Sequence, residues 1–153
     1  MSKQKEKRPM TRSHTLQSHL ISPSDTNHLQ TIFGGTVLAY IDEAAAIAAM
    51  RHSGKIVVTA SVDSVDFHSS VKSGDLVNVE AWVAATGRTS MVVYVHVSVE
   101  NPATEDTKTT TTSFVTMVAI DSSGNPTEVP GVFAETDAER EIIDMALSRK
   151  SGE

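Results

Sequence analysis

Apolar residues are concentrated in one long stretch in the first third of the chain. Residues 36–52 are dense in alanine, leucine, isoleucine and methionine, and neither glycine nor proline occurs among them. Because alanine has the highest helix propensity, this stretch predicts a helix of about 16 residues. Its apolar side chains lie on nearly every side of such a helix, which is typical of a helix surrounded by the rest of the protein.

A second pattern, the alternation of apolar and other residues, occupies much of the remaining chain and predicts strands. The predicted strands cover 14–21, 57–68, 76–84, 91–100 and 109–120. Within 57–68 the phase of the alternation changes, so we expect a bulge or a sharp bend near Asp63 and Ser64. Residues 137–150 have one apolar side and predict an amphipathic helix at the C-terminal end.

The order of these elements predicts an α+β fold. Consecutive strands joined by short turns favour an antiparallel sheet, and the long apolar helix is the element that such a sheet can enclose. We therefore expect one long central helix wrapped by a curved antiparallel sheet, followed by a C-terminal helix. Along the chain, the expected parts are a flexible basic tail at 1–12, one domain at 13–133 and a terminal helix at 134–153.

Composition and charge remove several classes of function. A chain of 153 residues has the length of one domain. It contains no cysteine, which excludes disulfides and cysteine nucleophiles and agrees with a cytoplasmic location. The net charge of −6 argues against nucleic-acid binding. The longest apolar stretch includes two acidic residues and is too short to span a membrane.

The absence of several short motifs narrows the chemistry further. None of the six histidines forms a pair with the spacing of zinc ligands on a helix, so no metal site is expected. The chain contains no G-x-S-x-G elbow of the serine hydrolases. It also contains no glycine-rich phosphate-binding or dinucleotide-binding motif, so no nucleotide cofactor is expected.

Asp42 is the most informative single residue, because it lies inside the apolar helix. Its neighbours at helical spacing are Leu38, Ala39, Ala45 and Ala46, and none of them can pair with a carboxylate. An unpaired carboxylate is costly to bury, so Asp42 must meet a partner from elsewhere in the fold or serve in a site, for example as a general base. Exposure to solvent and capping of a neighbouring segment are the alternatives.

Phe33, Gly34 and Gly35 stand directly before the apolar stretch. The first amides of a helix have no partners within it, and glycine lets a ligand approach them closely. This start can stabilise a developing oxyanion, although an ordinary turn into the helix would look the same. Asp42 lies two turns after Gly35, about 10 Å along the axis, so a site shared between two helices would bring both groups to one substrate more easily.

At these residues the chain resembles the hotdog-fold acyl-CoA thioesterases, in particular the group of the brain-type cytosolic acyl-CoA hydrolase and its small bacterial relatives. The matching features are Asn27, Phe33-Gly34-Gly35, Asp42 within 38–43, and the segments 62–67, 72–75 and 87–90. The resemblance covers about residues 14–130. The fold of this family, a long helix wrapped by a curved antiparallel sheet, agrees with the fold predicted above.

The resemblance implies hydrolysis of acyl-CoA to a free carboxylic acid and coenzyme A in cytoplasmic fatty acid metabolism. Asp42 would act as general base or nucleophile, and Asn27 would orient the water or the thioester. Backbone amides at Gly34 and Gly35 would stabilise the oxyanion. The resemblance also implies a homodimer, often assembled into a trimer of dimers, whose sites combine Asn27 of one protomer with Asp42 of the other. Coenzyme A is part of the substrate and product, so no cofactor is expected.

Coenzyme A is strongly anionic, whereas the chain is acidic, so its binding requires local cations. Arg88 is the best candidate, because its guanidinium fork between hydroxyl residues suits a phosphate. A plain hairpin turn with a solvated arginine is the alternative, and Arg51 is a second choice. The expected substrate-binding residues are Phe33, Lys72, Arg88, Thr89 and Ser90.

Two other functions remain open at this point. A hydratase or dehydratase of the hotdog fold would act on acyl thioesters, but this class usually uses a catalytic pair that includes histidine. His28, beside Asn27, is the only histidine near the motif. The third reading is a module that binds acyl-CoA without catalysis. We favour the thioesterase because an aspartate, Asp42, and not a histidine lies on the helix.

Overall fold

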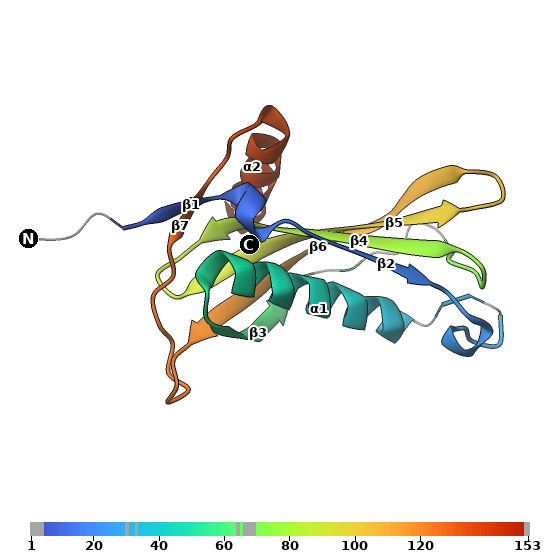
Figure 1. Ribbon diagram of the computed structural model, residues 1–153, viewed down its shortest axis with the longest axis horizontal. Coiled ribbons are helices and arrows are strands. Elements are labelled where there is room, and N and C mark those ends of the chain that lie inside the picture. Colours follow the sequence, from blue (N-terminus) through green and yellow to red (C-terminus); the bar gives the residue numbers. More distant parts are fainter. Residues whose placement is uncertain (1–4, 30, 33, 64, 66–69, 152–153) are drawn as a thin grey trace, which may run out of the picture.

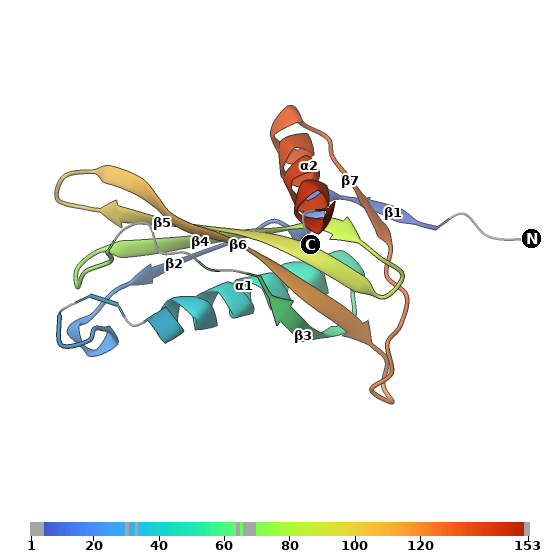
Figure 2. The ribbon, with the colours of Figure 1, turned by 180° about the vertical axis from the view of Figure 1, so that it is seen from behind.

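One curved sheet and one long helix form the body of the protein in the computed structural model, which describes residues 5–29, 31–32, 34–63, 65 and 70–151. The antiparallel sheet has the order β2 (Thr15–Leu20), β4 (Leu76–Thr86), β5 (Ser90–Asn101), β6 (Asp106–Ile120) and β3 (Ile56–Val62). Helix α1 (Gly34–Ser53) runs along one face of this sheet, and helix α2 (Asp137–Ser151) crosses the other face (Figures 1 and 2). The predicted α+β fold is therefore confirmed.

Helix α1 is longer than the apolar pattern predicts. It has 20 residues and begins at Gly34, so both glycines of the motif belong to its first turn. It ends before Gly54, whose φ of +71° is a left-handed conformation that glycine adopts without a steric penalty. The apolar stretch thus marks the middle of the helix, while the glycines mark its two ends.

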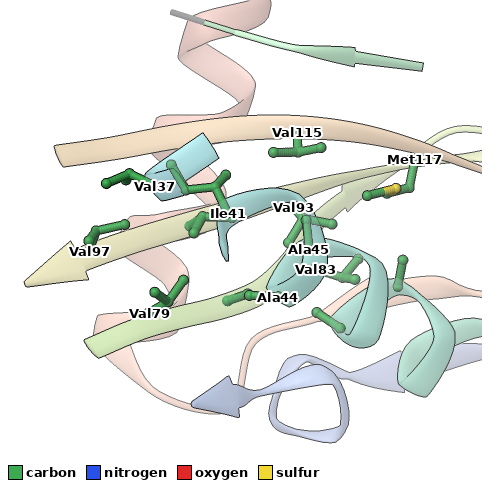
Figure 3. Packing of buried hydrophobic residues seen from close by; sticks show 14 of the residues in the cluster. Val37, Ile41, Ala44, Ala45, Val79, Val83, Val93, Val97, Val115 and Met117 are labelled. Atoms are coloured by element: carbon green, nitrogen blue, oxygen red, sulfur yellow. The ribbon is translucent and has the colours of Figure 1, made fainter. Parts of the chain in front are cut away.

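The core lies between α1 and the concave face of the sheet (Figure 3). Alternate residues of the central strands are fully buried there, as the alternation predicts: Val77, Val79, Ala81, Val83, Met91, Val93, Val95 and Val97. On the helix, Ala44, Ala45 and Ala48 are also fully buried. Their small side chains let the strands approach the helix closely, which explains why this helix is so rich in alanine.

Strand β3 is an edge strand and differs from its prediction. It ends at Val62, and its pairing with β6 shifts between Thr59 and Ser61. The irregularity therefore lies before the expected position near Asp63, and Ser64 lies outside the described residues. A change of phase locates a bulge only to within a few residues. Large apolar side chains of β3 are exposed, among them Ile56 at 63% and Val58 at 45%.

From Lys7 onward the basic N-terminal segment is attached to the fold, in contrast to the loosely attached tail expected over 1–12. Strand β1 (Lys7–Pro9) pairs in parallel with β7 (Gly131–Phe133), as Figure 1 shows, and the short helix η1 (Met10–Ser13) follows it. Met10 is fully buried, and the arginines on either side of it donate hydrogen bonds to backbone carbonyls of α1. One apolar residue among cations gives no periodic signal, so the pattern could not reveal this segment.

Helix α2 covers part of the convex face of the sheet. Ala146 is 1% exposed, and it belongs to a cluster with aromatic residues of the strands. Met145 and Leu147, two large apolar residues of the same helix, are 44% and 54% exposed. The helix therefore buries a narrower stripe than the sequence predicts. Among the described residues, no helix is long and apolar enough to cross a membrane.

Candidate active site

Asp42 meets its hydrogen-bond partner on the neighbouring edge strand. The hydroxyl of Thr59 on β3 donates to Asp42 Oδ1 over 2.6 Å. The carboxylate is half-buried, so it is neither fully desolvated nor freely solvated. This bond fulfils the expectation that Asp42 needs a partner from outside its helix. Among the described residues, none donates a hydrogen bond to Asp42 Oδ2, so this oxygen is available to a ligand.

Asp42 and Thr59 line a cavity of about 660 Å³ between α1 and β3, which we call the Asp42 cavity. Its other lining residues are Gly35, Leu38, Ala39, Val62, Asp63 and Val65. Nothing lies within 4 Å of the position that a Cβ on Gly35 would occupy, so the first turn of the helix is open on this side. The cavity therefore combines a carboxylate, the start of a helix and an apolar wall.

Asn27 lies between η2 (Pro23–Asp25) and α1. Its side-chain oxygen accepts bonds from the backbone nitrogen of Leu29 at 2.9 Å and from the hydroxyl of Thr31 at 3.2 Å. Bonds within the loop thus occupy Asn27 Oδ1, whereas the amide Nδ2 donates to no described residue and can donate to a ligand. Asn27 does not line the Asp42 cavity of its own chain. Phe33 lies outside the described residues.

A second acidic residue, Asp63, also lines the Asp42 cavity. It forms an ion pair with Arg149 of α2, in which the two side chains are 30% and 17% exposed, respectively. We singled out neither Asp63 as a site residue nor Thr59 from the sequence. The available signal was weak: Thr59 is one of many threonines in strands, and Asp63 follows a strand end as many aspartates do.

Arg88 lies in a different cavity, at the C-terminal end of α1. This cavity of about 790 Å³, the Arg88 cavity, is lined by Lys5, Glu6, Arg8, Ser53, Lys55, Arg88, Glu128, Val129 and Pro130. Lys5 donates to the carbonyl of Gly87 and Lys55 to that of Glu128. Carbonyl partners hold these cations in place without neutralising their charge. The four basic residues outnumber the two acidic ones, in a chain that is acidic overall.

The hairpin before β5 fixes the position of Arg88 by backbone bonds. Gly87 N donates to Ser90 O, and a Cβ on Gly87 would lie 2.7 Å from Ser90 Oγ, so a larger residue there would make the Ser90 hydroxyl move. The carbonyl of Thr89 accepts from Ala119 N at 3.0 Å. Thr89 and Ser90 are half-buried and do not line the Arg88 cavity, so their hydroxyls do not flank its guanidinium in the way that the sequence suggested.

The structure does not bring the remaining candidates to Asp42. Lys72 lines a third cavity of about 500 Å³ with residues of β5 and β6. Arg51 donates to the carbonyl of His14 and the hydroxyl of Thr15 on the far side of α1. His28 is exposed and lines none of these cavities. In the described part of the chain, no three histidine or acidic residues gather as a metal site would require.

Two titrating groups beside the Arg88 cavity are shifted by their surroundings. The hydrogen bond and the charge of Arg8 lower the pKa of Glu6, so this carboxyl stays ionised and partly offsets the cations. His52 is fully buried at the end of α1, and burial lowers its pKa, although its bond to the carbonyl of Pro130 acts in the opposite direction. Neutral imidazole is therefore the form that fits the fold.

Comparisons with known proteins point to one family. The profile of the thioesterase superfamily matches residues 29–105. The chain is 41% identical over 137 residues to the uncharacterized acyl-CoA thioester hydrolase YkhA of Bacillus subtilis, covering 90% of this chain and 80% of that protein. It is 31% identical over 145 residues to the cytosolic acyl coenzyme A thioester hydrolase of Rattus norvegicus, covering 92% of this chain and 38% of that longer protein.

Solved structures agree with the sequence relatives. The structure of an apo-hexameric acyl-CoA thioesterase has a TM-score of 0.92 at 52% identity, covering 96% of this chain and 94% of that chain. The acyl-CoA hydrolase of Staphylococcus aureus, in complex with butyryl coenzyme A and coenzyme A, has a TM-score of 0.90 at 41% identity, covering 95% and 88%. Three further structures of that hydrolase carry alanine in place of an asparagine, an aspartate and a threonine.

Proposed function

The chain belongs to the thioesterase superfamily and is an acyl-CoA hydrolase, and we propose that the Asp42 cavity is its active site. One observation carries this proposal. The carboxylate held by Thr59, the open first turn of α1 at Gly35 and an apolar wall all line the same cavity. A thioester needs the same three things: a base for water, donors for the oxyanion and room for the acyl chain.

Asp42 acts as the general base in the proposed reaction. Thr59 holds Asp42 Oδ1, so Asp42 Oδ2 accepts a proton from water while the water oxygen attacks the thioester carbonyl carbon. The tetrahedral intermediate then breaks its carbon–sulfur bond, and the proton passes to the sulfur of coenzyme A. Direct attack by Asp42 would form an anhydride instead. Oxygen-18 that enters Asp42 during a single turnover in labelled water would identify the anhydride route, because water that attacks the aspartyl carbonyl carbon leaves its oxygen in the protein, whereas a general base never acquires it.

Backbone amides at Gly34 and Gly35 are the proposed donors to the oxyanion. They belong to the first turn of α1, where amides have no partner within the helix and the helix dipole is positive. The open space beside Gly35 lets the thioester oxygen approach. The acyl chain then lies against the apolar wall of Leu38, Ala39, Val62 and Val65.

The complete site requires a second copy of the chain. Strand β3 leaves one edge of the sheet unpaired, and its exposed Ile56, Val58 and Val62 are a surface that a partner strand would cover. We therefore propose a homodimer in which two β3 strands pair, assembled into a trimer of dimers. The match to a hexameric thioesterase supports this arrangement. In the dimer, Asn27 of one protomer reaches the Asp42 cavity of the other.

Residue spacing in a relative supports the assignment of three site residues. Fifteen residues separate Asn27 from Asp42, and seventeen separate Asp42 from Thr59. The three alanine substitutions in the hydrolase of S. aureus have the same two spacings. Thr59, which the sequence did not single out, therefore joins Asn27 and Asp42 as a proposed site residue.

The Arg88 cavity is the proposed site for the phosphates of coenzyme A. Its cations come from three separate segments of the chain and supply the local positive charge that an acidic protein needs. We propose further that catalysis requires no metal or cofactor besides the substrate. A cytoplasmic location is also proposed, on the basis of the cytosolic relative.

Replacement of one carboxylate tests the proposal. Asp42→Asn should reduce kcat for acyl-CoA roughly 100-fold to 10,000-fold, as measured by thiol release. Glu43→Gln is the matched control, because Glu43 is the next residue of α1 but bonds to Gln17 outside the cavity. Near-native hydrolysis by Asp42→Asn would contradict the proposal. Consumption of enoyl-CoA without thiol release would favour a hydratase instead.

Mixing two inactive variants tests the shared site. When Asp42→Asn and Asn27→Ala protomers are exchanged, half of the dimers are mixed, and each mixed dimer contains one site with both native residues. About a quarter of the native activity should therefore return. No recovery, in samples where native mass spectrometry shows mixed dimers, would place both residues in the same chain.

A further inference from the structure

The C-terminal helix reaches the wall of the Asp42 cavity through one arginine. Arg149 lies near the end of α2, and its Nη1 pairs with Oδ2 of Asp63, which lines the cavity. The two side chains are only 17% and 30% exposed. Because solvent screens this pair less than a surface pair, its loss would leave a half-buried carboxylate without its counterion.

Both ends of this ion pair are fixed independently. The guanidinium carbon of Arg149 lies 5.3 Å from the centre of the Phe114 ring, and Ala146 of the same helix packs in the cluster to which Phe114 belongs. The backbone of Asp63 is held by β6, because Asp63 N donates to Phe114 O and Ser113 Oγ donates to Asp63 O, both over 2.9 Å. The pair therefore connects a packed helix to an anchored strand end.

The ion pair between Asp63 and Arg149 lies next to the residues that form the apolar wall of the Asp42 cavity, where the acyl chain is proposed to bind. Val62 precedes Asp63, Val65 follows it by two residues, and both residues line the cavity together with Leu38. Position 63 is thus the one charged point in this apolar wall. The ion pair with Arg149 holds the Asp63 carboxylate on the side of α2, away from the acyl chain. The same ion pair fixes the distance between this apolar wall and α1.

We propose that Arg149 is a positioning residue that sets the acyl-chain preference of the enzyme. This inference rests on the proposed function, since it takes the Asp42 cavity to hold the acyl chain. Without Arg149, the carboxylate of Asp63 turns toward water and draws the wall with it. Long acyl chains then lose contacts that a two-carbon acyl group never makes. The role of Arg149 is therefore to favour longer chains, with no part in breaking the thioester.

The test compares chain lengths in one variant. Arg149→Gln should raise KM for dodecanoyl-CoA about tenfold and change KM for acetyl-CoA less than twofold, with kcat nearly constant for both. Arg149→Lys, which keeps the charge, should restore most of the preference. Arg140→Gln makes the same change at an exposed position of the same helix and should behave like the native enzyme.

A second variant approaches the pair from its other end. Asp63→Asn should produce the same change in chain-length preference, and the double variant Asp63→Asn/Arg149→Gln should add little to either single change. Equal KM increases for all chain lengths, or changes that only follow a lower Tm, would overturn the proposal. So would additive effects in the double variant. If the native enzyme released no thiol from any acyl-CoA, the proposed function itself would fail, which is a separate outcome.

Discussion

The two cavities along α1 are lined in opposite ways. The Asp42 cavity, beside the first half of the helix, is lined by apolar residues and two acidic ones, whereas the Arg88 cavity, at the C-terminal end, is lined by four basic residues and two acidic ones. The acidic cavity suits bond cleavage in a neutral acyl group, and the basic one suits a polyanion. Under the proposed function, this difference would let a single helix keep the reacting thioester apart from the charged part of the same substrate.

Thr59 should show the largest effect in this comparison, because it touches the proposed base directly. Thr59→Val keeps the shape of the side chain but removes the hydrogen bond to Asp42. Since a hydrogen bond to a charged group contributes about 1.5–3 kcal/mol, kcat should fall roughly 10-fold to 100-fold. Thr59→Ser should retain most of the activity. Equal activity of the valine and serine variants in a thiol-release assay would show that the hydroxyl has no catalytic role.

Arg88 should show a smaller effect of a different kind. Arg88→Ala should raise KM for acetyl-CoA about tenfold and leave kcat almost unchanged, because a phosphate contact remote from the thioester contributes mainly to binding. The same variant should hydrolyse the acetyl-pantetheine thioester as the native enzyme does. Lys108→Ala removes an exposed cation outside the Arg88 cavity and serves as the control. A KM increase that is equal for the two thioesters would argue against a phosphate contact.

His52 should show the smallest effect, on stability and not on catalysis. Its pKa is lowered in the folded protein, so below about pH 6.5, the usual value for histidine, the unfolded chain binds more protons than the folded one. Stability from neutral His52 is therefore fully present above that pH and is lost as the pH falls. Urea unfolding at pH 7.5 and 5.5 should show this loss in the native protein, and a smaller loss in His52→Gln. A loss of the same size in both proteins would assign the pH dependence to other groups.

Much of the fold follows from periodicity, because its central elements are long and buried. The valine alternation of 76–84 and 91–100 predicts strands whose buried side is the observed one. Strands β1 and β7 have three residues each, too few to show any period, so no sequence pattern could reveal their pairing. Long helices and strands therefore show a period in the sequence, whereas strands of three residues do not.

The site residues also differ in whether the sequence alone reveals them. Asp42 stands out because a carboxylate inside an apolar helix conflicts with its surroundings. Thr59 conflicts with nothing in a strand, so only the contact between α1 and β3 identifies it. The cations beside Arg88 were equally hidden, since Lys5 is 83 positions away in the sequence and reaches the neighbouring Gly87 only in the folded chain. A residue that is unusual in its local sequence can be predicted, but contacts between distant segments cannot.

The parallel pairing of β1 with β7 has a consequence for biosynthesis. Strand β1 leaves the ribosome before strands β2 to β6, yet the segment that completes its ladder, Gly131–Phe133, is made only after them. Until then β1 has no strand partner, and only contacts such as the bonds from Arg8 and Arg12 to the carbonyls of α1 can hold this segment. Pairing of β1 is thus a late event, which can follow only after the central sheet and α1 have been synthesised.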